Sequence, residues 1–297
     1  MNVHQLSLKR LPYAGQVLIA VAALLWSSSG AVFRGVSIPS IQFLIIRSGF
    51  TVIVLSPFVW SRVVKKRLRQ DALRFLLSSF SFTLYTFGFI LTTRNIGAAT
   101  AITMQYSAPV YLFFVYLIIE RKIVLKRDYP KLIMIATLMV NGIWTTMRVA
   151  SLSYLFPAYM CGIGYALFTW SVKKLSHHSP MLIVASNNLL GLVFYIPFLL
   201  LTGEPFRALS GVELTIVVLV SLVVNTFSYV IFSAGLQSVK TLDASLITLI
   251  EPLMNPILVI LVLREIPASM DILILFIILS SLVLDLVHSH TVLIQRR

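Results

Sequence analysis

The chain has 297 residues, of which 58% are hydrophobic and only 11% are charged, and its formal net charge is +14. A soluble domain carries about 25% charged residues, so the composition excludes an ordinary soluble protein and indicates an integral membrane protein. The positive charge lies in short segments between apolar runs rather than on one folded basic surface, so we expect contact with a lipid bilayer and none with nucleic acid.

Ten apolar runs follow one another, each close to the roughly 20 residues that a helix needs to cross a bilayer. They are residues 13–33, 40–60, 73–93, 97–119, 131–147, 152–172, 182–202, 212–236, 243–263 and 270–287. None of them alternates apolar and polar residues as the strands of a membrane barrel do. The sequence therefore predicts an all-α membrane protein with ten transmembrane helices.

Lysine and arginine gather in every second connection between these runs. If the N-terminus is cytoplasmic, the cytoplasmic segments hold 18 of the 24 basic residues and the opposite segments hold five. The positive-inside rule then predicts a multi-pass protein of the cytoplasmic (inner) membrane with both termini cytoplasmic. We interpret the basic run 62–74 as an anchor to anionic lipid.

The two halves of the chain show a weak internal repeat. Residues 99–103 (ATAIT) and 244–248 (ASLIT) each begin an apolar run, and Glu120 and Glu265 end those runs at the same offset of 145 residues. Five helices per half is an odd number, so the halves must insert with opposite topology. Inverted repeats are typical of secondary transporters, in which the solute binds near the midplane. We expect two five-helix repeats, 1–148 and 149–297, although a shared amphipathic pattern could mimic this repeat.

The ninth run places a carboxylate in the apolar interior. Glu251 stands directly before Pro252, with Asn255 and Pro256 one turn later. Each proline removes a backbone donor and disturbs the carbonyl four residues back. Eight residues of helix place Glu251 about 12 Å from the inner boundary, where an ionised carboxylate costs at least about 2.5 kcal/mol. Glu251 is either a proton carrier, a partner for a cationic group of the solute, or a structural carboxylate bonded across helices.

Arg47 in the second run is the other charged candidate. It is the only basic residue that lies away from the ends of an apolar run, and its guanidinium can bind a carboxylate through two parallel hydrogen bonds. The alternative is a fixed tie between helices, including one to Glu251 itself. Further expected substrate-binding residues are polar or aromatic and lie inside their runs: Trp26, Tyr85, Gln105, Tyr106, Trp170, Asn225 and Tyr229. We expect helix kinks at Pro109, Pro252 and Pro256, and either close helix contacts or bending during gating at Gly30, Gly88, Gly162, Gly164 and Gly191.

At this point the chain resembles the drug/metabolite transporter superfamily, in particular its EamA-type members. The resemblance lies in Trp26-Ser27, Pro39 with Arg47, 95–99, 106–109 (YSAP) and, most fully, 229–265. It implies ten helices in two inverted repeats and the transport of small organic solutes, often amino acids or related metabolites, usually outward. One departure is that Ile119 and Arg264 stand where the family often has glycine.

These observations predict a secondary transporter, not an enzyme, that alternates access around a central cavity, coupled to protons through Glu251. The sequence lacks the P-loop pattern, so ATP is not the direct energy source. The alternatives are a lipidic or nucleobase-like solute, and an intramembrane enzyme, for which clustered catalytic groups are missing. No cofactor is expected, and the protein could be a monomer or a homodimer. His177-His178 have no cysteine or carboxylate beside them, so we expect no metal site there.

Overall fold

A computed structural model describes residues 13–59, 70–108, 110, 111, 114, 133, 136, 137, 140, 144, 152–175, 177–236, 238, 239, 247–264, 266–270, 272–277, 279–281, 283 and 284. Every regular element in this part of the chain is helical. Six stretches are long and apolar enough to cross a membrane: Ala14–Gly35, Ser40–Pro57, Ala72–Asn95, Leu155–Val172, Pro180–Thr202 and Gly211–Gly235. They coincide with the first, second, third, sixth, seventh and eighth predicted runs.

Two more predicted runs appear in shorter form. The fourth begins with α7 (Ala98–Tyr106) and the ninth contains α15 (Ile250–Leu263). Most of the fifth run, part of the tenth, both termini and Pro109 lie outside the described residues, so a count of ten helices stays a prediction. The expected helical class is confirmed, because no strand occurs among the residues that the structure describes.

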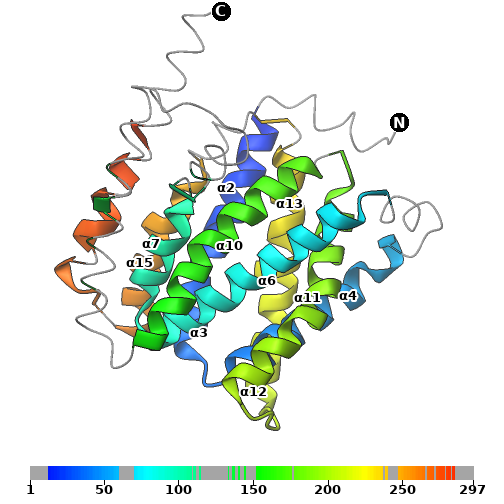
Figure 1. The fold of residues 1–297 in the computed structure, drawn as a ribbon, viewed down its shortest axis with the longest axis horizontal. Coiled ribbons are helices and arrows are strands. Elements are labelled where there is room, and N and C mark those ends of the chain that lie inside the picture. Colours follow the sequence, from blue (N-terminus) through cyan, green and yellow to red (C-terminus); the bar gives the residue numbers. More distant parts are fainter. Residues whose placement is uncertain are drawn as a thin grey trace, which may run out of the picture.

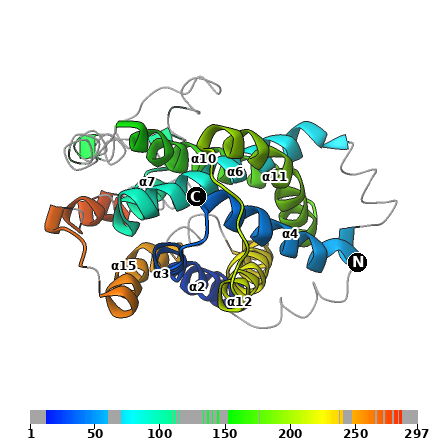
Figure 2. The same cartoon turned by 90° about the horizontal axis from the view of Figure 1, so that it is seen from below.

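The helices lie in two layers. In Figure 2, α6 (Ala72–Asn95), α10 (Leu155–Lys174) and α11 (Pro180–Thr202) form one layer, while α2 (Ala14–Ser27), α3 (Ser29–Gly35), α12 (Gly211–Leu219) and α15 form the other. α4 (Ser40–Val59) and α7 lie between the layers. The α3–α4 and α11–α12 links lie at the same end of the bundle, at the bottom of Figure 1.

Two of the spans depart from regular α-helix. The first is interrupted at Ser28, between α2 and α3, where the hydroxyls of Ser27 and Ser28 donate to the carbonyls of Ala23 and Leu25. Serine side chains that bond the preceding turn in this way often bend helices. The eighth span runs from α12 through a π-helix, η3 (Val220–Phe227), into α13 (Ser228–Leu236). Single π-helical stretches are frequent at functional sites.

Glycines let α6 and α10 approach closely. A Cβ at Gly88 would lie 2.5 Å from the carbonyl oxygen of Pro157, and a Cβ at Gly164 would lie 2.5 Å from the backbone nitrogen of Tyr85. Across the bundle, a Cβ at Gly30 would meet the Asn255 side chain at 2.4 Å. Small residues at contacts of this kind are how helices pack in membranes, where apolar surface itself gives no drive to associate. Of the two expected roles, close helix contact is confirmed for these glycines.

Arg264, at the end of α15, has the left-handed φ of +57°. Glycine adopts this conformation without steric cost, and helices commonly end on a glycine in it. This explains in physical terms why a glycine would suit the position at which the sequence departs from the family pattern.

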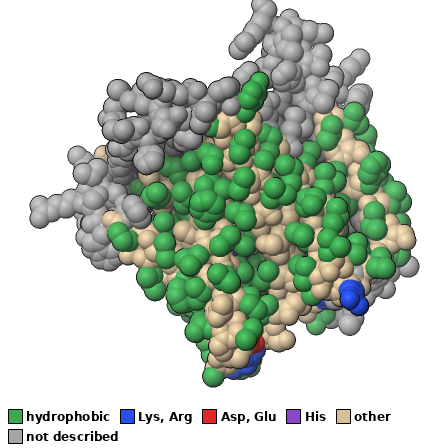
Figure 3. All heavy atoms as spheres, turned by 180° about the vertical axis from the view of Figure 1, so that it is seen from behind, with side chains coloured by type: hydrophobic (Ala, Val, Ile, Leu, Met, Phe, Trp, Pro, Cys, Tyr) green, Lys and Arg blue, Asp and Glu red, His purple; other side chains and the backbone are tan. Residues whose placement is uncertain are grey.

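The outer surface is apolar around the bundle. On the face seen in Figure 3, hydrophobic side chains cover most of the described area, and charged side chains appear only toward the lower edge. Large apolar side chains are fully open on several helices, for example Leu200 and Leu201 on α11 and Leu261 on α15, each more than 70% exposed. An apolar surface of this extent is suited to lipid.

Candidate functional site

A small cavity lies at the centre of the bundle, between the two layers. It has a volume of about 30 Å³, which is room for about two water molecules. Its walls come from seven elements and consist of Trp26, Ser29, Phe33, Arg47, Tyr85, Thr86, Phe89, Val220, Val224, Asn225, Tyr229 and Glu251. Two opposite charges, from α4 and α15, therefore face the same buried space.

Glu251 is held by the end of α7. Its side chain is 2% exposed; Gln105 Nε2 donates to Oε1 over 3.2 Å and the Tyr106 hydroxyl lies 2.9 Å from Oε2. The same hydroxyl lies 2.8 Å from the carbonyl oxygen of Thr248. Thr248 is four residues before Pro252, so this is the carbonyl that the proline disturbs. The polar spot expected around Glu251 is present, and the single O–H of Tyr106 lies within hydrogen-bond distance of both acceptors and donates to one of them at a time.

The contact between Tyr106 and Glu251 joins two residues that are 145 positions apart, which is also the offset between residues 99–103 and residues 244–248. Gln105 and Tyr106 are the last two residues of α7, and Glu251 is the second residue of α15. The carboxylate of the second half of the sequence is therefore held by residues of the first half.

Arg47 is buried without a partner for its charge. The residue is 5% exposed, and neither Nε nor Nη2 has a hydrogen-bond partner. Among the described residues it forms no ion pair, with Glu251 or any other carboxylate. Its guanidinium carbon lies 5.7 Å from the ring centroid of Phe82, a cation–π distance that offsets part of the desolvation. The interhelical tie between Arg47 and Glu251 is therefore absent from this structure.

An amide and hydroxyl network holds the wall next to Arg47. The Asn225 amide nitrogen donates to the Asn188 side-chain oxygen over 2.9 Å and to the Thr51 hydroxyl over 2.8 Å, and Thr226 Oγ1 lies 2.9 Å from the same hydroxyl. The π-helix brings the successive residues Asn225 and Thr226 to this contact with α4. Asn225 Oδ1 remains buried without a partner, as does the indole nitrogen of Trp26 across the cavity. Both are polar atoms that a bound solute could satisfy.

Aromatic rings form the rest of the wall. Trp26 lies 4.8 Å from Tyr229, and Tyr85 lies 5.1 Å from Tyr165, measured between ring centroids. Phe82 packs against Tyr229 at 5.6 Å. The cavity thus combines two charges with rigid, apolar ring surface.

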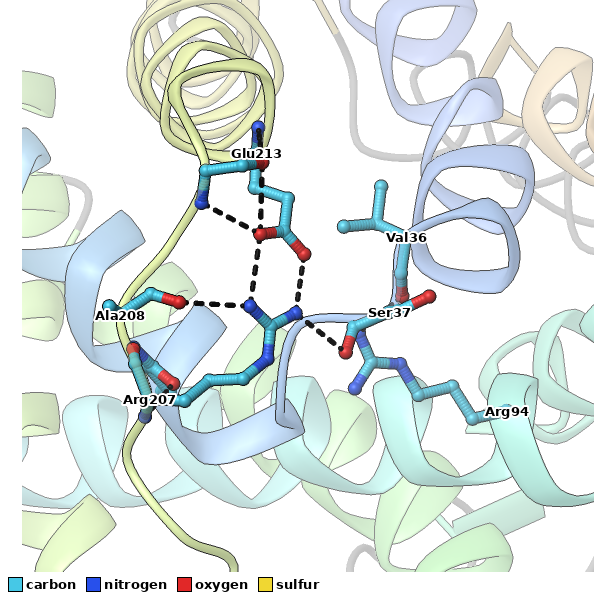
Figure 4. A network of polar contacts seen from close by, with 8 residues as sticks. Val36, Ser37, Arg94, Arg207, Ala208 and Glu213 are labelled. Atoms are coloured by element: carbon cyan, nitrogen blue, oxygen red, sulfur yellow. Dashed lines mark hydrogen bonds and ion pairs between the residues drawn. The ribbon is translucent and has the colours of Figure 1, made fainter.

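The α3–α4 and α11–α12 links are fastened together at one end of the bundle, in what we term the end latch (residues 36–42 and 204–213). Gln42 Nε2 donates to the Arg207 carbonyl over 2.6 Å, and the Arg207 amide donates back to Gln42 Oε1 over 3.2 Å. Glu204 Oε2 accepts from the amide of Ile41, at the start of α4, over 2.9 Å. Figure 4 shows the Arg207 guanidinium forked onto Glu213 and reaching the carbonyl of Ser37. The hydrogen bonds that Arg207 donates to Glu213 raise the pKa of Arg207 above its ordinary value.

Most residues singled out in the sequence come together here. Six line the cavity: Trp26, Arg47, Tyr85, Asn225, Tyr229 and Glu251. Gln105 and Tyr106 are not among the residues that line the cavity, but both form hydrogen bonds with Glu251. Trp170 does not line the cavity; it is half-buried, with Lys174 Nζ 5.6 Å from its ring centroid. Pro252 and Pro256 lie within α15. The solute-binding role of all these residues stays a prediction.

Sequence reasoning missed the other half of the wall. Ser29, Phe33, Thr86, Phe89, Val220 and Val224 line the cavity and were not expected to. Thr86 follows Tyr85, and Ser29 and Phe33 continue the face of Trp26 past the break at Ser28. Helical spacing is the signal that could have found them, because Ser29 and Phe33 lie three and seven residues after Trp26 and Phe89 lies four residues after Tyr85.

A bundle of membrane-length helices around a cavity lined by Arg47 and Glu251 is the arrangement expected of a membrane transporter. The comparison with known families agrees. The model of the EamA-like transporter family matches residues 13–147 and again residues 151–286, and the chain belongs to this family. Two matches in one chain fit a pair of repeats.

Individual relatives are more distant. The chain is 26% identical over 268 residues to a protein of Salmonella typhimurium named as the uncharacterized inner membrane transporter YicL, covering 84% of this chain and 87% of that protein. It is 25% identical over 242 residues to an uncharacterized transporter of Archaeoglobus fulgidus, covering 80% and 84%. A crystal structure with 14% identity superimposes with a TM-score of 0.63, covering 92% of this chain and 96% of its own. That likeness supports the fold alone.

Proposed function

We propose that the protein is a proton-coupled secondary transporter of small zwitterionic metabolites, with amino acids as the leading class. The observation that carries this proposal is that Arg47 and Glu251 line one cavity, are both almost fully buried, and do not pair with each other. A buried charge without a partner is strongly unfavourable. A solute that presents a carboxylate and an ammonium group would satisfy both side chains at once.

The unpartnered nitrogens of Arg47 and the carboxylate of Glu251 suit the two charged groups of such a solute. Nε and Nη2 of Arg47 are adjacent donors that suit the two oxygens of one carboxylate. Glu251 is the acceptor for the ammonium group on the opposite side of the cavity. Trp26 and Tyr229 would pack against the apolar part of the solute. Because the walls hold several aromatic rings, a solute with a planar side chain is compatible with the same site.

The cavity is too small to hold such a solute in the present conformation. Sites for small organic ligands have volumes of roughly 300–1,000 Å³, whereas this cavity has about 30 Å³. The structure therefore corresponds to a contracted state, and loading requires helices to separate. The end latch is the natural gate at its end of the bundle, because Gln42, Arg207 and Glu204 join two links that must part for the cavity to open there.

Proton coupling follows from competition for one carboxylate. Ionised Glu251 holds the ammonium group of the solute, and protonated Glu251 does not. A proton arriving on Glu251 would therefore release the solute, and loss of that proton would restore binding. This exchange supports outward transport against an inward proton flow, which is also the direction implied by the resemblance to the family.

The proposal also includes the membrane location, the side of the termini, the two repeats and the oligomeric state. The name of the Salmonella relative supports the cytoplasmic (inner) membrane as the location, and the basic residues support cytoplasmic termini. We retain residues 1–148 and 149–297 as the two repeats. A monomer and a homodimer are both compatible with the proposal.

The test uses three matched ligands: an amino acid, the amine that lacks its carboxylate, and the acid that lacks its ammonium group. Thermal shift of the purified protein should respond to the amino acid and much less to either half-ligand. Each lost charged hydrogen-bonded contact should weaken binding by about 1.5–3 kcal/mol, or roughly 10–150-fold. In proteoliposomes, a pH gradient should drive counterflow of the same amino acid.

Two carboxylate variants make the test specific. Glu251→Gln should bind the acid half-ligand as wild type does and should abolish pH-driven flux. The control is Asp71→Asn, which changes a carboxylate directly before α6, outside both the cavity wall and the end latch. Unchanged pH-driven flux in Glu251→Gln would refute the coupling. A response only to nucleobases or to lipids would replace the zwitterion with that class of solute.

A further inference from the structure

Away from the cavity, three metal-ligating side chains meet at the start of α6. Asp71 directly precedes α6, and His177 and His178 lie in the link between α10 and α11. His177 Nε2 is 3.0 Å and His178 Nε2 is 2.8 Å from the same oxygen, Asp71 Oδ2. The three possible ligand atoms lie within 4.8 Å of one another. Spacing along the chain does not indicate this cluster, because 106 residues separate Asp71 from His177.

Each of the three side chains is fixed or accessible in the way a metal site needs. Arg74 donates to the other carboxylate oxygen, Asp71 Oδ1, over 2.6 Å and so orients the carboxylate. His178 is 5% exposed, and its ring packs against Phe75 with centroids 5.0 Å apart. His177 is about half exposed, with a side-chain accessibility of 55%, which leaves a path from solvent. Two ligands are therefore held in place and the third is open to an arriving ion.

The carboxylate carries the charge that a cation requires. Hydrogen bonds from His178 and His177 hold the pKa of Asp71 below its ordinary value, with a smaller contribution from Arg74. Two imidazole nitrogens and one carboxylate oxygen form the donor set typical of zinc and its neighbours, and unlike the all-oxygen set that calcium and magnesium prefer.

We propose that Asp71, His177 and His178 form a binding site for one divalent transition metal ion of the zinc class, with a fourth position open to water. Metal–nitrogen and metal–oxygen bonds of about 2.0–2.2 Å in tetrahedral geometry need donor atoms roughly 3.3–3.5 Å apart. The observed separations of 3.0 and 2.8 Å must widen by about half an ångström, which rotation of the exposed His177 ring and a small shift of Asp71 supply. Each histidine then gives up its Nε2 proton to the other ring nitrogen and binds the metal through Nε2.

The site would join two parts of the chain that are distant in sequence. Asp71 belongs to the start of α6, and the two histidines belong to the link before α11, so a bound ion would fasten α6 to the α10–α11 link. An ion that binds the folded state alone stabilises it in proportion to the logarithm of its concentration. The sequence-based expectation of no metal site at His177-His178 rested on the absence of a nearby carboxylate, and the fold supplies one.

The test uses the full chain, purified without a polyhistidine tag, treated with a chelator and dialysed. Zn²⁺ titration followed by calorimetry should give saturable binding of one ion per chain, and Zn²⁺ should raise the unfolding temperature while Mg²⁺ should not. Cu²⁺ bound at one equivalent should show hyperfine coupling to two imidazole nitrogens in its electron paramagnetic resonance spectrum.

His177→Gln separates a metal site from a hydrogen-bonded tie. Glutamine can still donate to Asp71 but is a poor ligand for zinc, and the exposed position makes misfolding of the variant improbable. We expect unchanged unfolding temperature without metal, at least a tenfold loss of Zn²⁺ affinity, and coupling to one nitrogen for Cu²⁺. His290→Gln, which leaves the cluster intact, is the control and should behave as wild type.

Three results would overturn the proposal: the absence of saturable one-to-one binding, Zn²⁺ affinity unchanged in both His177→Gln and Asp71→Asn, or equal loss of affinity in His290→Gln. The last two would mean that the ion binds elsewhere on the chain. None of these readouts depends on transport, so the metal site and the transport proposal can fail separately.

Discussion

Replacing Arg47 with methionine should stabilise the empty protein and abolish solute binding. Methionine fills a similar volume and has no polar group to satisfy. Arg47 Nε and Nη2 are buried without partners, at a cost of about 1–3 kcal/mol each. The cation–π contact with Phe82 at 5.7 Å returns about 0.5–2 kcal/mol. At the midpoints of these ranges the balance predicts that Arg47→Met gains about 3 kcal/mol, which corresponds to a rise in unfolding temperature of about 5 °C.

Arg94→Met is the matched control. The Arg94 guanidinium donates to the carbonyls of Phe33 and Val36 and to the hydroxyl of Ser40, at 3.1, 3.1 and 2.8 Å. The same substitution there removes three satisfied bonds from a charged group, so it should destabilise the protein by at least about 3 kcal/mol. The assay is thermal unfolding of both variants in one detergent, with and without the amino acid that shifts the wild type.

The two arginines must therefore move the unfolding temperature in opposite directions. If Arg47→Met lowers it as Arg94→Met does, Arg47 is a structural tie and the assignment to solute binding is wrong. If Arg47→Met is stabilised yet keeps the full ligand-induced shift, the solute does not use Arg47. Only stabilisation together with loss of the shift agrees with the reasoning.

Three further predictions concern packing, the carboxylate and the gate. Gly88→Ala should destabilise by about 1–3 kcal/mol, because its Cβ would meet backbone atoms of α10, while Gly49→Ala, with no atom within 4 Å, should stabilise by about 0.4–1 kcal/mol. Tyr106→Phe should cost about 1–3 kcal/mol of stability, because it removes the hydroxyl shared by two buried acceptors. Gln42→Ala should loosen the end latch and speed thiol labelling of Ser29→Cys in the cavity by about 5–150-fold.

Each of these has a result that would contradict it. Equal unfolding temperatures for Gly88→Ala and Gly49→Ala would mean that α6 and α10 are not in close contact. A Tyr106→Phe variant as stable as wild type would show that the hydroxyl is replaceable by water. Unchanged labelling in Gln42→Ala, measured in a chain whose native cysteine is removed, would place the gate elsewhere.

Much of the architecture was readable from the sequence because it depends on local properties. Apolar length fixed six of the predicted spans to within a few residues of their bounds, since a segment without charges has no other stable place than a bilayer or a core. Pro252 likewise predicts a disturbed carbonyl at Thr248, because the proline ring clashes with the carbonyl group four residues earlier in the chain. The choice of Glu251 and Arg47 as candidate site residues followed from the cost of any charge in an apolar run.

Only the tertiary structure decided which of these groups meet. Whether Arg47 pairs with Glu251 depends on the approach of α4 to α15, which no spacing along the chain specifies, and the structure keeps them apart across a cavity. The meeting of Asp71 with His177 and His178 over 106 residues is of the same kind. The sequence by itself determined where helices form and which residues are costly to bury, because these are properties of neighbouring residues; the partners of those residues depend on how the helices pack.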